Sequence, residues 1–259
     1  MDPTPARTTI FVLCFNYARY LREAVESALG QDDDGVRVVV VDDGSTDDTP
    51  SVAASFGDLI RYFRKPNGGL SEARNYAAAR CDTEFLMYLD ADDRLPSDFV
   101  RTCRSRLEEV SNVGFVFTQL RYFGDRGGTS SFPPFDPQRL KRGSCIASCS
   151  LMRSGLVQRY GYDTRLRHGL EDWDFYLTLA EHGHRGVLVD STHVWYRVHG
   201  SSMGDTVQRD RRRRQWTYLR ILWKHRRFFG ARGAVGLVRR SVRYRLGSRS
   251  RSASRCATR

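Results

Sequence analysis

Four short apolar segments alternate with amphipathic ones between residues 9 and 89, and this alternation limits the fold more than any other feature of the chain. Strands are expected at residues 9–15, 36–41, 59–63 and 84–89, and helices at residues 19–29, 46–56 and 70–80. The second strand is β-branched and almost continuously apolar, which suits a parallel strand covered on both faces. The alternation predicts an α/β fold with a Rossmann-like, mostly parallel, doubly wound sheet and right-handed crossovers.

The pattern is less regular beyond residue 93. We expect helices at 97–110 and 173–181, strands at 114–122, 186–190 and 193–198, a flexible loop at 124–137, a strand or turn at 144–152, and basic amphipathic helices at 209–229 and 234–246. The predicted organisation is an α/β domain at 1–204, a basic helical extension at 205–247 and a disordered low-complexity tail at 248–259.

Positive charge is concentrated at the C-terminal end of the chain. Residues 205–259 hold 18 Lys and Arg against 2 acids, and residues 1–204 hold 24 against 28, which together give the net charge of +12. No nucleic-acid-reading motif accompanies these arginines, so nucleic acid is not expected as a partner. A hydrophobic content of 40% is enough for a sizeable core and excludes a disordered chain.

The chain has six cysteines, and none of them forms a CxxC pair. This usage predicts a reduced, intracellular protein with small buried thiols instead of a disulfide framework. The sequence contains no recognisable signal peptide and no stretch of about 20 apolar residues that could span a bilayer. The predicted location is therefore the cytoplasm.

Carboxylates follow two of the expected strands. Asp42 and Asp43 come after the second strand, and Asp90, Asp92 and Asp93 come after the fourth. Ligands of such sheets bind beyond the carboxyl ends of the strands. Three carboxylates in one loop are costly unless a cation neutralises them, and oxygen ligands suit Mg²⁺ or Mn²⁺, which in turn recruits a diphosphate. The alternative is an acidic turn that caps the helix at 97–110.

Two further motifs favour a nucleotide at the same edge. A carboxylate at the end of a strand, such as Asp42, can accept a hydrogen bond from a base or a ribose hydroxyl, although it can also belong to an ordinary turn. The segment Asn67-Gly68-Gly69 opens a helix that carries Arg74 one turn later. A helix N-terminus beside an arginine favours an anion, whereas the alternative is a Gly-rich loop with a surface arginine.

The last two motifs contain a carboxylate and a histidine. Asp172 lies near the start of an expected helix, where it could take a proton from an incoming hydroxyl. Its neighbours Glu171 and Asp174 could instead be capping or structural residues. His199 follows an expected strand and could be the nitrogen ligand of a metal, although a lone histidine is more often structural.

The order and spacing of these motifs resemble the family 2 glycosyltransferases. The resemblance covers residues 8 to about 203 and rests on Phe15-Asn16, VVVVDDGSTDDT, NGGLSEARNYA, YLDADD, LEDWDF and YRVHGSS. It implies a GT-A fold and inverting transfer from a nucleotide-diphosphate sugar, with UDP favoured, to a saccharide or lipid-linked acceptor. By analogy, the pathway is cell-surface polysaccharide or glycolipid assembly. The QxxRW motif of processive synthases is absent from the sequence, which favours the addition of a single sugar.

The resemblance also implies roles for individual residues in a nucleotide-sugar site. Phe15 would lie against the nucleobase, and Asp42, with Asp43, would accept hydrogen bonds from it. Asn67 and Arg74 would lie near the base and the diphosphate. The same site would include Ala91 and Glu171.

The remaining implied roles concern the ribose, the metal and the reaction. Asp90 would contact the ribose. Asp92 and His199 would coordinate Mn²⁺ or Mg²⁺. Asp172 would be the general base.

The basic extension at 205–247 interleaves arginines with aromatic residues. Such helices suit an anionic membrane surface, which predicts a peripheral location at the inner face of the cell membrane, close to lipid-linked acceptors. A helical lid, an oligomer contact and a solvated basic face are the alternatives.

Two other functions are compatible with the same class of sheet. A nucleotidyltransferase would show a Gly-rich signature with Lys or Arg near the N-terminus, but residues 9–18 contain no glycine. A non-catalytic nucleotide-sugar-binding or membrane-surface module would have lost one of the key acids, whereas Asp90, Asp92 and Asp172 are all present.

Overall fold

The computed structural model describes residues 6–110, 112–167, 169–200 and 211–230. At its centre lies an eight-stranded sheet in which β3-β2-β1-β4-β7-β5-β6 are neighbours in that order and β8 pairs with β5. Four adjacent strands are parallel: β3 (Arg61–Arg64), β2 (Val36–Asp42), β1 (Thr8–Cys14) and β4 (Phe85–Asp90). The predicted α/β fold with a mostly parallel sheet is confirmed.

The other four strands extend the sheet beyond β4. The short β7 (Leu151–Arg153) is antiparallel to both β4 and β5 (Val113–Gly124). β6 (Gly128–Thr129) is antiparallel to β5, and β8 (Arg185–Val198) is parallel to β5. β8 is one strand where two are predicted from the sequence, and its pairing shifts register opposite Thr118 and Gln119.

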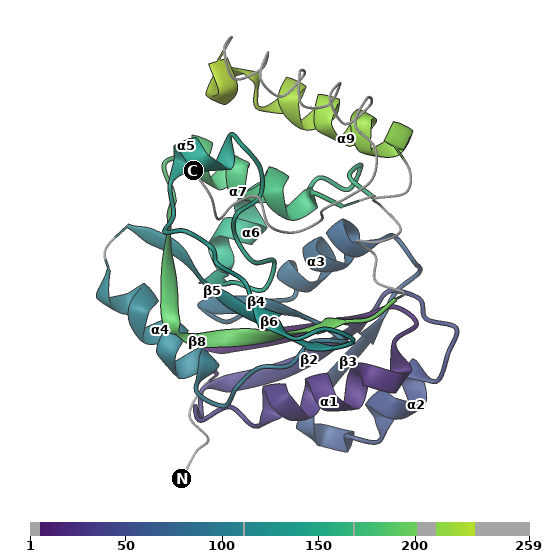
Figure 1. Cartoon of the computed structure of the whole chain (residues 1–259). Coiled ribbons are helices and arrows are strands. Elements are labelled where there is room, and N and C mark those ends of the chain that lie inside the picture. The colour runs from purple at the N-terminus through teal and green to yellow at the C-terminus, as the bar shows by residue number, and fades with distance from the viewer. Residues whose placement is uncertain (1–5, 111, 168, 201–210, 231–259) are drawn as a thin grey trace.

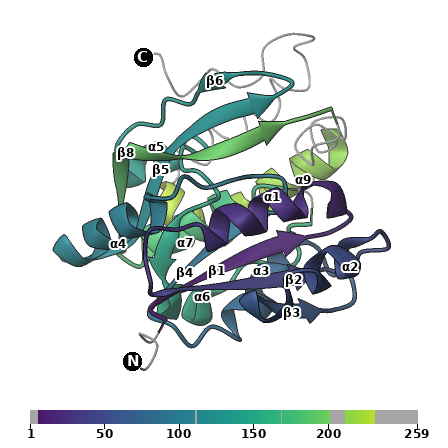
Figure 2. The ribbon, with the colours of Figure 1, turned by 90° about the horizontal axis from the view of Figure 1, so that it is seen from below.

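Helices cover both faces of the sheet (Figures 1 and 2). On one face lie α1 (Ala18–Leu29), α2 (Thr49–Ala54) and α4 (Phe99–Glu109). On the other lie α3 (Leu70–Ala78), α6 (Ser154–Tyr160) and α7 (Glu171–Glu181). The short α5 (Pro137–Leu140) and a 3₁₀ helix (Gly57–Leu59) lie in connections. α9 (Arg211–Lys224) packs outside α7, as a further layer (Figure 1).

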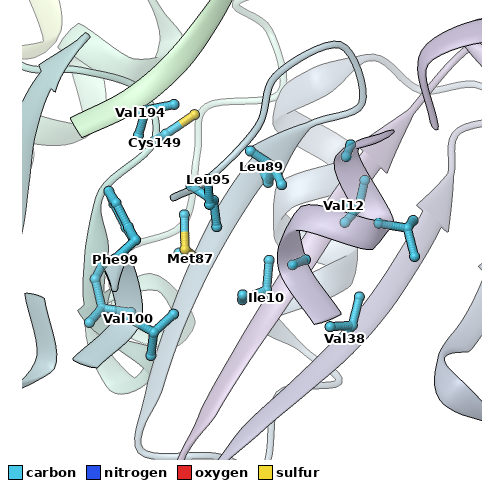
Figure 3. Close-up of a cluster of buried hydrophobic side chains, with 14 of the residues drawn as sticks. Ile10, Val12, Val38, Met87, Leu89, Leu95, Phe99, Val100, Cys149 and Val194 are labelled. Carbon is cyan, nitrogen blue, oxygen red and sulfur yellow. The ribbon is translucent and has the colours of Figure 1, made fainter. Parts of the chain in front are cut away.

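Alternate side chains of β1 enter the two halves of the core. Ile10 and Val12 pack on the side of α1 and α4, where Phe99 joins them (Figure 3). Phe11 and Leu13 pack on the side of α3 and α7. Because both faces of β1 are covered, every residue of this strand is buried, which explains why its sequence is apolar after the first two threonines.

The helix expected at 46–56 is shorter in the structure because Asp47 has another role. Its Oδ2 accepts from the backbone N–H of Ala18 at 2.9 Å, which caps the start of α1. Its Oδ1 accepts from the backbone N–H of Thr49 at 3.1 Å and from the Thr49 hydroxyl at 2.6 Å, at the start of α2. One carboxylate therefore fixes the beginnings of two helices.

The predicted loop at 124–137 contains regular structure that its composition conceals. It includes β6, and the side chain of Gln119 in β5 holds the following segment in place. Its Oε1 accepts from the Ser130 hydroxyl at 2.9 Å and from the Phe132 backbone N–H at 2.7 Å. α6 is also missing from the sequence-based prediction, and of the predicted segment 144–152 only the last two residues belong to a strand, β7.

The end of α9 and the following residue, His225, are attached to α7 through a cluster of polar side chains around one buried acid. The fully buried Asp174 of α7 contacts Lys224 Nζ at 2.6 Å and His225 Nε2 at 3.0 Å. The other nitrogen of His225, Nδ1, lies 2.8 Å from Glu181 Oε2, so that His225 is held between two acids of α7. The second helix expected in the extension, at 234–246, lies outside the described residues.

The cluster predicts a large loss of stability when its central carboxylate is removed. Asp174→Ala should lower the free energy of unfolding by about 3 kcal/mol, because it leaves His225 and Lys224 without their shared acceptor. Chemical denaturation of the full chain measures this change. Glu26→Ala, which removes an exposed acid of α1, is the control and should change stability by less than about 0.5 kcal/mol. Equal effects of the two substitutions would contradict the importance of the cluster.

Candidate nucleotide-sugar site

The carboxyl ends of the parallel strands meet at one edge of the sheet. The strand register places Asp42 beside Cys14, Asp90 beside Leu13, and Arg64 beside Asp42. The acids that follow β2 and β4 therefore lie along the same edge, where sheets of this type bind ligands. The predicted site residues form two groups there: one around the end of β2 and the start of α3, the other around the ends of β4 and β8 and the start of α7.

In the first group, Asp42 fixes the turn after β2. Its carboxylate is completely buried, and Oδ1 accepts from the Ser45 backbone N–H at 2.7 Å while Oδ2 accepts from the Tyr62 hydroxyl at 2.6 Å. Burial and the bond to Asp42 raise the pKa of Tyr62, so the phenol stays protonated and continues to donate. Asp42 thus has a fixed position at the sheet edge.

Asp43 organises the loop that precedes α3. Its Oδ1 accepts from Lys65 Nζ at 2.6 Å and from the Gly68 backbone N–H at 3.0 Å, and its Oδ2 accepts from the Gly69 backbone N–H at 2.8 Å. With three donors inside the protein, Asp43 acts chiefly on the shape of this loop.

The turn after β2 requires a glycine, and two residues predicted to contact the nucleotide lie at the surface nearby. Gly44 has a φ of 81°, and a Cβ atom there would lie 2.7 Å from the backbone nitrogen of Asn67. Asn67 itself is exposed, and so is Phe15, with 44% of its surface accessible at the end of β1. Both side chains are accessible to a ligand at this edge.

In the second group, the acidic loop after β4 is attached to β8. The backbone N–H of Asp93 donates to the carbonyl of Asp90 at 3.0 Å, which closes the turn. Arg197 of β8 then holds the loop at two points: its backbone N–H donates to Asp93 Oδ1 at 2.8 Å, and its Nε donates to the carbonyl of Asp92 at 2.9 Å. Arg197 is a functional candidate that sequence reasoning missed, although it lies two residues before His199 in the same motif.

Asp92 and His199 face one another across this loop. Asp92 Oδ2 lies 2.9 Å from His199 Nε2, and the histidine is 8% exposed, with its ring beside those of Tyr17 and Tyr20. A carboxylate oxygen and an imidazole nitrogen at this separation could both bind one cation. These are the two residues predicted from the sequence as ligands of Mn²⁺ or Mg²⁺.

The acidic loop carries more negative charge than its surroundings compensate. Burial raises the pKa of Asp90 to about 6; Arg74 opposes this rise, whereas Asp92 and Glu171 add to it. Ala91 is the buried residue of this loop, and its backbone N–H donates to the carbonyl of Leu13 in β1 at 3.0 Å. A cation beside Asp92 would relieve this excess of charge.

A buried carboxylate and a buried thiol lie behind the same loop. Ligand atoms of Asp90, Asp93 and Cys149 lie within 4.8 Å of one another. Burial, Asp90 and Asp92 hold the pKa of Asp93 well above its ordinary value, and its Oδ2 has no partner among the residues the structure describes. Burial likewise raises the pKa of Cys149, so the thiol adds no charge.

Arg74 lies at the centre of the second group and is almost completely buried. Its Nη1 donates to Glu171 Oε1 at 3.0 Å, and its guanidinium lies 5.0 Å from the centre of the Tyr162 ring. Burial lowers the pKa of Arg74, but the larger opposing effect of Tyr162, Glu171 and Asp90 raises it above its ordinary value. The guanidinium is therefore charged. Its Nε has no acceptor within the described part of the chain.

Asp172 lies at the first turn of α7, next to Glu171. The turn follows Leu170, whose φ of 68° changes the chain direction, and Asp172 Oδ1 accepts from the backbone N–H of Trp173 at 2.7 Å. Burial and the Glu171 carboxylate raise the pKa of Asp172 to about 6, whereas Arg74 lowers it. A carboxylate with this pKa can accept a proton near neutral pH.

The structure therefore brings together most of the residues predicted for the metal, the diphosphate and the base. These are Arg74, Asp90, Asp92, Glu171, Asp172 and His199. Phe15, Asp42, Asp43 and Asn67 lie in the first group, toward β2 and β3. The roles themselves stay predictions.

The model of the family described as glycosyl transferase family 2 matches residues 9–161. The chain belongs to this family. An uncharacterized glycosyltransferase of Rickettsia felis is 45% identical over 87 residues, which are 33% of this chain and 14% of the relative. The chondroitin synthase of Escherichia coli is 27% identical over 186 residues, which are 68% of this chain and 26% of the synthase. The chain thus spans about a quarter or less of the length of these two proteins.

Solved structures show the fold of this family 2 glycosyltransferase chain. S. aureus TarS 1-349 in complex with UDP is 20% identical, with a TM-score of 0.64, over 87% of this chain and 73% of the TarS 1-349 chain. The mannosyltransferase PcManGT from Pyrobaculum calidifontis, in complex with GDP-Man and Mn²⁺, is 19% identical, with a TM-score of 0.63, over 96% of this chain and 79% of that enzyme. The predicted GT-A fold is confirmed.

The raised pKa of Asp172 predicts an acid limb in the pH profile of sugar transfer. A general base is active only when it is ionised. At saturating donor concentration, the transfer rate should therefore be constant above a pH of about 6 and should fall about tenfold for each pH unit below it. Initial rates in buffers of constant ionic strength measure this. A rate that is flat from pH 5 to about 7 would contradict the assignment of Asp172 as the base.

Proposed function

We propose that this chain is an inverting, metal-dependent glycosyltransferase that moves a hexosyl group from a nucleotide-diphosphate sugar to an acceptor hydroxyl. The observation that carries the proposal is the position of Asp172, beside the buried Arg74–Glu171 pair and on the same sheet edge as the Asp92–His199 pair. A base, a buried cation and a set of metal ligands are the groups that such a displacement needs.

The reaction would be a single displacement. Asp172 accepts the proton of the acceptor hydroxyl while the hydroxyl oxygen forms a bond to the anomeric carbon. The bond from that carbon to the diphosphate oxygen breaks, so the configuration inverts. Arg74 contributes a fixed positive charge to a site with several carboxylates, and its unpaired Nε is a donor for a ligand oxygen.

The other residues would bind the donor. Phe15 offers an exposed ring for the nucleobase, and Asp90 a carboxylate for the ribose. Asp42 would accept from base N–H groups only after its buried carboxylate exchanges a bond to Ser45 or Tyr62 for one to the base. Mn²⁺ or Mg²⁺ held by Asp92 and His199 would stabilise charge on the diphosphate when bound. UDP is favoured as the nucleotide, since TarS is described with UDP, although PcManGT is described with GDP-Man.

The acceptor is proposed to be a saccharide or a lipid-linked sugar, in cell-surface polysaccharide or glycolipid assembly. The proposed location is the cytoplasm, peripheral at the inner face of the cell membrane, with residues 205–247 at the anionic lipid surface. Across the described part of the chain, no helix combines the length and the apolar character needed to cross a bilayer.

The role of the base predicts a specific defect in Asp172→Asn. The amide keeps the size of the side chain but cannot take a proton, so transfer should fall by about 10²- to 10⁴-fold. The transfer rate is measured as release of nucleoside diphosphate from UDP-sugars, with a panel of saccharide and lipid-linked acceptors. Donor affinity and the unfolding midpoint should be unchanged. Near-normal transfer by the variant would show that another group is the base.

The predicted metal ligands can be tested without knowing the acceptor. In calorimetric titrations of the full chain with UDP, GDP and dTDP, one nucleotide should bind with Mn²⁺ and lose most of its affinity with EDTA. Asp92→Asn and His199→Gln should lose the same metal-dependent part, since each removes one ligand. The control Asp125→Asn changes an exposed acid of the β5–β6 loop and should bind normally. Absence of metal-dependent binding in the unmodified chain would favour a non-catalytic module.

A further inference from the structure

The two sides of α9 have different surroundings. Thr217, Ile221 and His225 are nearly or fully buried against the body of the protein. On the opposite side Trp216 is 50% exposed, Leu219 47% and Trp223 70%. These three residues are spaced by three and four positions, so with 3.6 residues per turn they form one continuous stripe.

The exposed stripe is unusual for this molecule. Only three other large hydrophobic side chains in the described part of the chain are exposed, and they are scattered at the end of β1, at the end of α1 and before β3. A contiguous stripe with two tryptophans marks a contact surface more strongly than single exposed residues do.

The rim of the stripe is basic. The guanidinium of Arg226 lies 4.9 Å from the ring centre of Trp223. That of Arg220 lies 5.6 Å from the ring centre of Trp216 but is paired with Asp163 at 2.8 Å, so the rim's charge comes chiefly from other residues. Arg226 and Arg227 are exposed, and with Lys224 they line a surface hollow between the ends of α7 and α9. The sequence of α9 also begins with four consecutive arginines and contains no acid.

We propose that the outer face of α9, with Trp216, Leu219 and Trp223, together with Arg226 and Arg227 just beyond its end, is the surface that binds an anionic lipid bilayer. Tryptophan and leucine side chains enter the boundary between headgroups and acyl chains, while the arginines contact lipid phosphates. A second copy of the chain fits this face less well, because two faces of equal positive charge would repel each other. This inference rests on the membrane attachment proposed above and assigns it to one face of one helix.

The attachment of α9 gives this surface a fixed position relative to the candidate base. Asp174 is bound to Lys224 at the end of α9 and to the following residue, His225, and it lies two residues after Asp172 on α7. The bilayer would therefore contact the enzyme on the side of α7, away from α1 and α2 (Figure 1). An acceptor carried by a lipid would approach Asp172 from this side.

The proposal can be tested by flotation of the full-length chain with vesicles, in the absence of any nucleotide sugar. The chain should bind vesicles of phosphatidylcholine with phosphatidylglycerol at least about tenfold more tightly than vesicles of phosphatidylcholine alone, and salt should weaken the binding. Trp216→Ser/Trp223→Ser should lose at least about tenfold in affinity for the anionic vesicles.

A matched double variant controls for loss of exposed apolar surface. Leu29→Ser/Leu59→Ser also removes two exposed side chains, but from α1 and from the segment before β3, and should bind vesicles as the unmodified chain does. Both double variants should keep the unfolding midpoint. Asp172→Asn should bind vesicles normally, so that a failure of the catalytic proposal is distinguished from a failure of this one.

Three results would overturn the assignment. The first is unchanged vesicle binding by the tryptophan variant, since the lipid contact would then lie elsewhere in the chain. The second is equal affinity of the unmodified chain for neutral and anionic vesicles. The third is a dimer in light scattering that the tryptophan variant converts to a monomer without any lipid binding, because the stripe would then be an interface between two copies.

Discussion

The buried ion pair between Arg74 and Glu171 joins the parts of the molecule on which the candidate site depends. Arg74 comes from α3 and Glu171 from the start of α7, nearly a hundred residues apart in the sequence. A lone buried charge on either helix would be strongly destabilising, so each requires the other. The pair also places positive charge beside Asp90 and Asp172, which without it would be a group of carboxylates with no internal cation.

The remaining charge imbalance explains how the site could select its ligands. Arg74 opposes the rise in pKa at Asp90 and Asp172 but does not cancel it, and the pKa of Asp93 is also held well above its ordinary value. A divalent ion beside Asp92 would lower the cost of keeping these groups ionised, and the diphosphate would follow the ion. Metal affinity and the protonation of the site are therefore expected to be coupled.

Much of the fold, and the meeting of most candidate site residues at one edge of the sheet, could be predicted from the sequence. Parallel strands buried on both faces leave a continuous apolar pattern, and their carboxyl ends share one edge. The predictions failed where distant partners decide the structure. Asp47 shortens α2 by bonding to α1, and Gln119 orders a loop whose composition indicates flexibility. The part of Arg197 in holding the acidic loop, and the contacts of Asp174 with Lys224 and His225, likewise depend on partners across the fold that no local pattern reveals.

The first turn of α7 faces in two directions. Glu171 and Asp172 turn toward the sheet edge, whereas Trp173 and Asp174 pack toward α9, with the Trp173 ring 5.7 Å from that of Tyr218. Four consecutive residues therefore meet different requirements: the first two lie at the proposed catalytic site, and the last two pack toward α9. A substitution in α9 that shifts this helix by a fraction of an ångström would move the candidate base with it, without touching any residue of the site.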